Sequence, residues 1–151
     1  MSEPSVVAIV ILLVEDNRGD VFLVQSALAE HNIPHQLHAV RDGEQAIRYL
    51  EELAAVKDSP LWPDLIVLDL NLPRKSGQEV LARIRGFERF KTTRVIAMSS
   101  SAAPEDKHEV SSLGAHAYFT KPSNLDDFMK LGQLIKDVLG PEQNDLRRFG
   151  G

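Results

Sequence analysis

Residues 11–16 read Ile-Leu-Leu-Val-Glu-Asp, and residues 65–69 read Leu-Ile-Val-Leu-Asp. Each stretch is a run of four large apolar residues that ends in acid. Such runs are typical of strands in a parallel sheet that is covered on both faces, and side chains that follow these strands meet at one edge. Clustered acids are costly unless a cation neutralises them, and hard divalent ions such as Mg²⁺ prefer oxygen ligands. Glu15, Asp16 and Asp69 therefore predict a metal site that can handle phosphoryl groups.

The rest of the chain alternates strand-like and helix-like stretches. The predicted strands are Ile9–Val14, His35–Val40, Asp64–Asp69, Arg94–Ser99 and Ala115–Thr120. The predicted helices are Gly19–His31, Asp42–Ala55, Gly77–Arg85, Pro104–Leu113 and Leu125–Leu139. Five strands that alternate with five helices predict an α/β protein with a doubly wound parallel sheet. We expect one domain over residues 9–139, flanked by tails at 1–8 and 140–151.

Composition narrows the class of protein. The 151 residues are 43% hydrophobic and 26% charged, which suits one globular domain. A formal net charge of −5 argues against a nucleic-acid partner. The longest apolar run, Val6–Val14, is too short to span a bilayer, and it lacks the basic start of a signal peptide. The chain has no cysteine, which fits a reducing compartment. We therefore expect a cytoplasmic protein with neither a membrane nor a nucleic acid as partner.

Four chemically useful side chains fall at predicted strand ends: Asp16, Asp69, Ser99 and Lys121. A metal-binding acid, a carboxylate nucleophile, a hydroxyl and an ammonium together form a set suited to phosphoryl transfer. Three of them also have a simpler interpretation: Asp69 as a turn cap, Ser99 as a small buried residue and Lys121 as a solvated amine. The shared edge favours the functional interpretation.

Four segments in register resemble the receiver domains of two-component response regulators, over about Ile9 to Leu139. They are residues 12–17 (Leu-Leu-Val-Glu-Asp-Asn), residues 68–73 (Leu-Asp-Leu-Asn-Leu-Pro) with Gly77, residues 98–100 (Met-Ser-Ser) and residues 118–122 (Tyr-Phe-Thr-Lys-Pro). The resemblance implies a flavodoxin-like (βα)5 fold with strand order 2-1-3-4-5. It also implies a signalling phosphoacceptor that receives a phosphoryl group from a sensor histidine kinase. Such a protein is not an enzyme, because it assists only its own phosphorylation and dephosphorylation.

The resemblance assigns a role to each site residue. Asp69 would be the phosphoacceptor, and Glu15, Asp16, Asp69 and the Asn71 carbonyl would hold Mg²⁺ or Mn²⁺. Ser99 and Lys121 would bind the phosphoryl group and act in the switch, and Tyr118 would be the aromatic that reports it. Asn71 and Ser101 would tune dephosphorylation. The family also leads us to expect a cis peptide bond before Pro122.

Further segments resemble the small stand-alone regulators that pair with bacterial phytochromes, which makes a bacteriophytochrome the expected type of kinase. They are residues 14–17 with Asp20, residues 41–43, the loop at residues 57–63, residues 69–75 and residues 121–125. The chain departs from these relatives at Ser76, where aspartate is frequent, and at Ser99, where threonine is usual.

No output domain is expected after Leu139, so we expect the signal to leave through a partner or through self-association. Two stripes of apolar side chains run along the last predicted helix. The first, suited to the core, contains Leu125, Phe128, Gly132, Ile135 and Leu139; the second contains Leu131, Leu134 and Val138. A helix with one buried face needs only one stripe. The second stripe therefore predicts a homodimer face, although scattered apolar residues are also common on surfaces.

Three other functions stay open. A Mg²⁺-dependent phosphohydrolase would also use a nucleophilic aspartate, but Asn71 stands where such enzymes usually place a second acid. A flavin or dinucleotide module would need a glycine-rich phosphate loop after the first strand, and Asn17-Arg18-Gly19 is insufficient. A phosphorylation-independent interaction module would be free to lose the acids, yet all of them are present.

Overall fold

The computed structural model describes residues 8–149, so the predicted tail at residues 1–8 lies almost wholly outside the described part. One sheet of five parallel strands forms the centre, in the order β2-β1-β3-β4-β5. The strands are β1 (Ile9–Val14), β2 (His35–Val40), β3 (Leu65–Asp69), β4 (Arg94–Ser99) and β5 (Ala117–Thr120). The doubly wound sheet and its strand order are confirmed.

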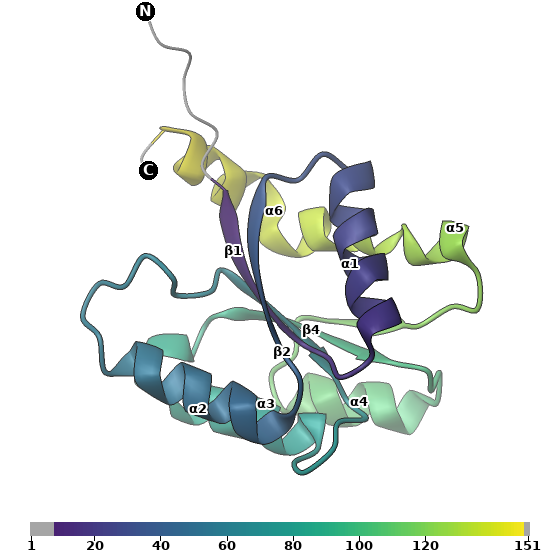
Figure 1. Cartoon of the computed structure of the whole chain (residues 1–151), viewed down its shortest axis with the longest axis horizontal. Coiled ribbons are helices and arrows are strands. Elements are labelled where there is room, and N and C mark those ends of the chain that lie inside the picture. Colours follow the sequence, from purple (N-terminus) through teal and green to yellow (C-terminus); the bar gives the residue numbers. More distant parts are fainter. Residues whose placement is uncertain (1–7, 150–151) are drawn as a thin grey trace, which may run out of the picture.

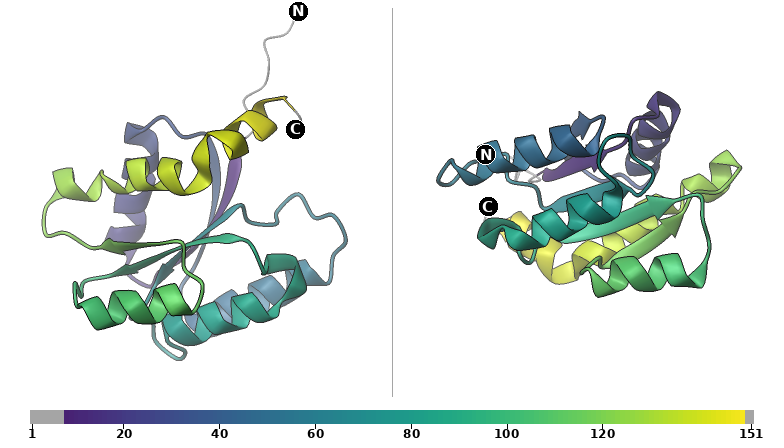
Figure 2. Two further views of the ribbon diagram at one scale, coloured as in Figure 1. Left: turned by 180° about the vertical axis from the view of Figure 1, so that it is seen from behind. Right: turned by 90° about the horizontal axis from the view of Figure 1, so that it is seen from below.

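Helices cover both faces of this sheet, as Figures 1 and 2 show. One layer holds α2 (Gly43–Ala54), α3 (Gly77–Gly86) and α4 (Pro104–Ser112), with the short 3-10 helix η1 (Glu88–Phe90) after α3. The other layer holds α1 (Arg18–Glu30), α5 (Leu125–Phe128) and α6 (Leu131–Phe149). Within residues 8–149, no helix is both long and apolar enough to cross a membrane.

Alternation along the strands divides the core into two clusters. On β1, Leu12 and Val14 pack with the layer of α2 and α3, whereas Ile11 and Leu13 pack with the layer of α1 and α6. All four side chains are almost completely buried because successive strand residues point to opposite faces. The uninterrupted apolar runs thus arise from a sheet that is covered on both sides.

Side-chain caps fix where several helices begin. Asn17 accepts a hydrogen bond from the backbone N–H of Asp20, and Asp42 accepts one from that of Gln45. Ser76, which departs from the related regulators, accepts a hydrogen bond from the backbone N–H of Glu79 at 3.2 Å. These bonds satisfy amide groups that the first turn of a helix leaves unpaired. The serine at position 76 therefore starts α3, directly after the segment that carries Asp69.

The last helical segment differs from the prediction. It consists of α5 and α6 instead of one helix, and Leu131 is completely buried in the core. The assignment of Leu131 to a dimer face was wrong, because residue 131 follows Phe128 by three positions and precedes Ile135 by four, which places all three on one face. Leu125, predicted for the core, begins α5 and is 57% exposed. Leu134 and Val138 are partly buried at the border of the same core cluster.

The end of the chain is also more helical than predicted. The structure continues α6 to Phe149, with a break at Gly140, whose φ of 72° lies in the left-handed region. Glycine adopts this region without the steric cost that a Cβ atom imposes. The break falls at the predicted domain boundary.

Candidate metal and phosphoryl site

The carboxyl edge of the sheet brings the predicted site residues together, because the backbone pairing of the strands continues into the loops. The Glu15 N–H donates to the Val40 carbonyl at 3.0 Å, and the Lys121 N–H donates to the Ser99 carbonyl at 2.7 Å. The N–H of Leu70 donates to the Met98 carbonyl at 2.9 Å. Each site segment is thus fixed to a neighbouring strand before its side chain makes any contact.

Three acids form one cluster at this edge. Carboxylate oxygens of Glu15, Asp16 and Asp69 lie within 4.8 Å of one another. Glu15 and Asp69 are buried, at 2% and 3% exposure, whereas Asp16 is exposed. Oxygen donors at this spacing, with one acid open to solvent, fit a hard divalent cation that keeps part of its water shell. The three acids predicted as metal ligands are therefore close enough to hold such an ion together.

Lys121 supplies positive charge inside the acidic cluster. Its Nζ donates to Glu15 Oε1 and to Asp20 Oδ2, both at 2.8 Å, and lies 3.4 Å from Asp69 Oδ2. Asp20 was not among the predicted site residues. It lies in the first turn of α1, whose capping residue Asn17 follows Asp16 directly. An acid four residues beyond a predicted metal ligand, on the first turn of the next helix, is the signal that could have identified it.

The pKa values of this ion cluster are shifted. Burial raises the pKa of Glu15 from 4.5 to about 7; the hydrogen bond from Lys121 opposes this shift, and the neighbouring Asp69 adds to it. Burial by itself lowers the pKa of Lys121, but hydrogen bonds to Asp20 and Glu15 outweigh burial and raise it above 10.5. Lys121 therefore stays charged, whereas Glu15 exchanges its proton near neutral pH in the absence of metal.

The backbone around Asp69 fits closely. The Asn71 N–H donates to Asp69 Oδ1 at 3.0 Å, which orients the carboxylate. Gly77, the first residue of α3, lies against the same segment: a Cβ atom there would come within 2.6 Å of both the Asp69 carbonyl oxygen and the Leu70 Cα. Only glycine lets α3 start this close to the acceptor strand.

Ser99 and Tyr118 connect this edge to α4. The buried Ser99 hydroxyl accepts a hydrogen bond from the Ser101 N–H at 3.1 Å, and the Asn71 side-chain amide lies 3.5 Å away. Tyr118 Oη donates to the Ser101 carbonyl at 2.6 Å. The Ser101 hydroxyl donates to Asp106 on α4. A displacement of Ser99 would therefore act on the partners of both Tyr118 and α4.

The Lys121–Pro122 bond is trans, since residues 8–149 contain no cis peptide bond. The prediction of a cis bond before Pro122 was wrong. The trans isomer is the lower-energy form of an X–Pro bond, and with it the Lys121 side chain already reaches all three of its acidic neighbours.

Residues 11–133 match the family model of the response regulator receiver domain. The chain belongs to the response regulator receiver family. It is 40% identical to the response regulator Rcp1 of Synechocystis sp. over 136 residues, which cover 90% of this chain and 92% of Rcp1. This confirms the predicted resemblance and the flavodoxin-like receiver fold.

Solved receiver structures agree with this family assignment. The phosphorylated cyanobacterial phytochrome response regulator RcpA shares 37% identity and a TM-score of 0.74, over 86% of this chain and 92% of RcpA. The Mn²⁺-bound form of Rcp1 shares 41% identity and a TM-score of 0.73, over 84% of this chain and 91% of that one. Related receivers thus include one crystallised in a phosphorylated state and one with a divalent metal.

Proposed function

We propose that Asp69 accepts a phosphoryl group from a phosphohistidine of a sensor histidine kinase. The observation that carries the proposal is the single ammonium of Lys121 placed among three carboxylates, with the buried Asp69 at 3.4 Å. In the reaction, an Asp69 carboxylate oxygen attacks phosphorus, a P–O bond forms, and the P–N bond to histidine breaks with the electron pair leaving on nitrogen. Water later attacks the acyl phosphate and restores the carboxylate.

The remaining side chains neutralise and position the transferred group. Glu15, Asp16, Asp69 and the Asn71 carbonyl would hold Mg²⁺, or Mn²⁺ as the relative Rcp1 does. Such an ion supplies positive charge to the phosphoryl oxygens. Lys121 is already within reach of Asp69 and, once phosphate replaces free carboxylate, would pair with a phosphoryl oxygen. Related phosphorylations add a charge of about −1.5 to −2, which gives Lys121 a stronger partner than Glu15 or Asp20.

The proposed switch starts at Ser99. Movement of its hydroxyl toward the phosphoryl group would remove the acceptor of the Ser101 N–H and thereby shift the carbonyl that holds Tyr118. The two positions of this segment would be the states that phosphorylation biases. Whether Asn71 and Ser101 also tune dephosphorylation stays a prediction; Ser101 is paired with Asp106 in the present state.

We further propose a kinase of the phytochrome type, in the cytoplasm, on the strength of the similarity to RcpA. Output through self-association also stays a prediction and now depends on the half-buried Leu134 and Val138 without Leu131. Sedimentation with and without a phosphoryl mimic tests it, and a monomer in both conditions would contradict it. Phosphotransfer from a purified bacteriophytochrome kinase, compared with an unrelated histidine kinase, tests the choice of partner.

The decisive experiment is incubation with acetyl phosphate and Mg²⁺, followed by intact mass measurement. We expect the mass of one phosphoryl group on the parent chain and none on Asp69→Ala. The matched control Asp64→Ala removes an acid from the opposite end of β3, and it should leave labelling intact. An unlabelled parent chain would overturn the proposal, whereas continuous turnover of a small phosphate ester would revive the phosphohydrolase alternative.

A further inference from the structure

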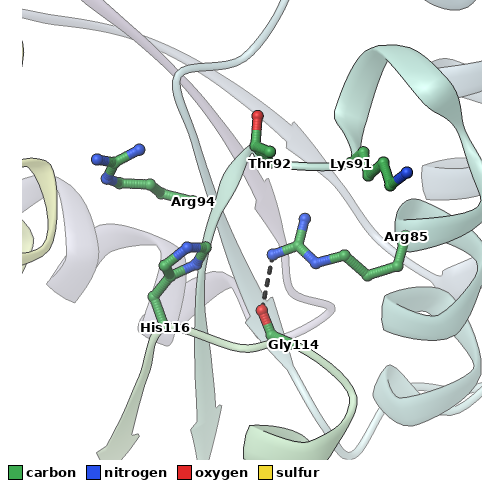
Figure 3. Close-up of a pocket in the computed structure, with 6 residues that line it drawn as sticks. All are labelled: Arg85, Lys91, Thr92, Arg94, Gly114 and His116. Atoms are coloured by element: carbon green, nitrogen blue, oxygen red, sulfur yellow. Dashed lines mark hydrogen bonds between the residues drawn. The ribbon is translucent and has the colours of Figure 1, made fainter.

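A basic cavity lies at the amino edge of the sheet, opposite the edge that carries Asp69 (Figure 3). It has a volume of about 570 Å³ and is open to solvent. Its walls come from the end of α3, the segment that leads into β4, and the turn between α4 and β5. The residues that line it are Arg85, Lys91, Thr92, Arg94, Gly114 and His116. Three basic side chains therefore line one cavity in a chain whose net charge is −5.

Neutral groups hold the two guanidinium groups in place. Arg85 donates to the carbonyl of Phe90 at 2.9 Å and to that of Gly114 at 2.7 Å. Arg94 donates through Nε to the carbonyl of Val138 at 2.9 Å. These carbonyls fix the orientation of the side chains but leave their charges uncompensated. Among the ion pairs between side chains of residues 8–140, none involves Arg85, Lys91 or Arg94.

His116 shows that the positive fields converge on this cavity. The Val95 N–H donates to His116 Nδ1 at 3.1 Å, so that nitrogen is an acceptor and the ring proton lies on Nε2. Burial lowers the pKa of His116, and the charges of Arg85 and Arg94 lower it further. In Figure 3 the imidazole ring lies between the two arginines. Both guanidinium groups therefore act on the imidazole ring of His116, which lines the cavity.

We propose that this cavity binds the phosphate group of a small phosphorylated molecule. Three positive charges, two of them on guanidinium groups of fixed orientation, suit a dianion better than a monocarboxylate, and the planar donor fork of arginine matches phosphate oxygens. The exposed hydroxyl of Thr92 adds a polar group to the rim. A cavity of this volume also leaves room for an organic body beside the phosphate. The ligand is either inorganic phosphate or an organic phosphate ester, which share this chemistry.

The two edges are distinct, so this proposal does not depend on phosphorylation of Asp69. Binding here needs no metal, because the cations are side chains of the protein. A titration in the presence of a chelator removes metal-assisted phosphate binding at the acidic edge. Failure of one proposal therefore leaves the other standing.

The test is an NMR titration of the full chain with inorganic phosphate and, separately, with adenosine monophosphate, at constant ionic strength and with a chelator present. We expect saturable amide shifts at residues 85, 91–94 and 114–116. The charge reversal Lys91→Glu should weaken binding about tenfold, as the loss of one nearby charge pair implies. The matched control Lys57→Glu changes an exposed lysine outside the cavity and should leave the affinity at the parent value.

Two variants, Lys91→Glu and Arg94→Gln, separate an effect on binding from an effect on folding. Lys91 is exposed, so its replacement leaves the packing intact. Arg94→Gln should weaken binding too, with circular dichroism showing that the fold is retained. Tighter binding of adenosine monophosphate than of phosphate would identify an organic ester, and equal affinities would identify phosphate alone. Shifts that do not saturate with either probe, or equal losses in Lys91→Glu and Lys57→Glu, would overturn the proposal.

Discussion

The two edges of the sheet carry opposite charge and balance it differently. At the carboxyl edge, three acids pair with one lysine, a fourth acid, Asp16, lies beside Glu15 and Asp69, and the excess is negative. At the amino edge, neutral carbonyls orient Arg85 and Arg94, Lys91 lies beside them, and the excess is positive. One edge is therefore completed by a cation and the other by an anion. The fold thus brings charged side chains together at both ends of the strands. Which residues stand there decides whether the net charge of that edge is negative or positive.

The strongest test of the acidic edge is removal of its internal cation. Lys121→Ala leaves Glu15, Asp20 and Asp69 without a positive partner, and we expect a loss of about 3 kcal/mol in the free energy of unfolding. The loss stays at the low end for a buried ion pair because Glu15 can take up a proton. Urea unfolding in metal-free buffer measures it, and added Mg²⁺ should restore part of the stability.

The control for this change is Lys130→Ala. Lys130 is 75% exposed, and among the described residues it pairs with Asp127 at 3.0 Å, so its loss should cost at most about 1 kcal/mol. Equal losses in the two variants would mean that the acidic edge does not depend on Lys121. In phosphorylation assays, Lys121→Ala should retain some labelling of Asp69 while the conformational change is lost.

The next effect concerns how closely α3 approaches Asp69. Gly77→Ala would place a Cβ atom 2.6 Å from the Asp69 carbonyl oxygen, and overpacking of this kind costs about 1–3 kcal/mol. The displaced Asp69 should also accept phosphate more slowly from acetyl phosphate. Gly86→Ala, at the other end of the same helix, meets nothing within 4 Å and should be neutral or stabilising by up to about 1 kcal/mol. Similar effects of the two alanines would contradict the close-approach argument.

Much of the acidic edge could be predicted from the sequence, and the physical reason is topological. Buried strands are recognisable in the sequence as apolar runs. Parallel pairing of these strands then brings Asp16, Asp69 and Lys121 to one edge of the sheet. Asp20 was not predicted because it reaches Lys121 from the first turn of a helix, and the prediction considered only residues at strand ends. The face of α6 was misassigned because Leu131 fits two stripes until the contacts of Phe128 and Ile135 are known.

The basic edge could not be predicted in the same way. Arg85, Lys91, Arg94 and His116 come from a helix end, a connecting segment, a strand start and a turn, so no periodic pattern links them. Their convergence depends on how α3 and the turn before β5 pack on β4. The hydrogen bond from Arg85 to Gly114 joins two of these parts, and only tertiary structure reveals it.

A third prediction uses the raised pKa of Glu15. A metal ligand must be deprotonated, so Mg²⁺ affinity should fall about tenfold between about pH 8 and about pH 6 for one group with a pKa of about 7. In the absence of metal, the free energy of unfolding changes with pH in the opposite direction to the Mg²⁺ affinity. The folded chain keeps a proton that the unfolded chain releases near pH 4.5, so stability falls as the pH rises from about 4.5 to about 7.

Calorimetric titration with Mg²⁺ at both pH values measures the affinity change. Glu15→Gln should bind Mg²⁺ more weakly at the higher pH and lose most of the pH dependence. A parent chain with equal affinities at the two pH values would show that Glu15 does not supply the titrating ligand. The basic residues of the amino edge should not contribute to the heat of Mg²⁺ binding, because they do not contact the metal site.

The smallest effect belongs to His116 and tests the other half of the comparison. Burial and the charges of Arg85 and Arg94 hold its pKa below the ordinary value of 6.5. The folded chain therefore binds this proton less readily than the unfolded chain does, and stability contributed above pH 6.5 is lost as the pH falls. An NMR titration of the imidazole signals should show the lowered pKa directly.

Phosphate in the cavity would offset the arginine charges, so the same titration with phosphate should give a higher pKa for His116. His108, an exposed histidine on α4 outside the cavity, is the internal control, and its NMR signals should not respond to phosphate. An equal response of both histidines would mean that phosphate acts on the whole surface, and the amino edge would then be basic without being a site.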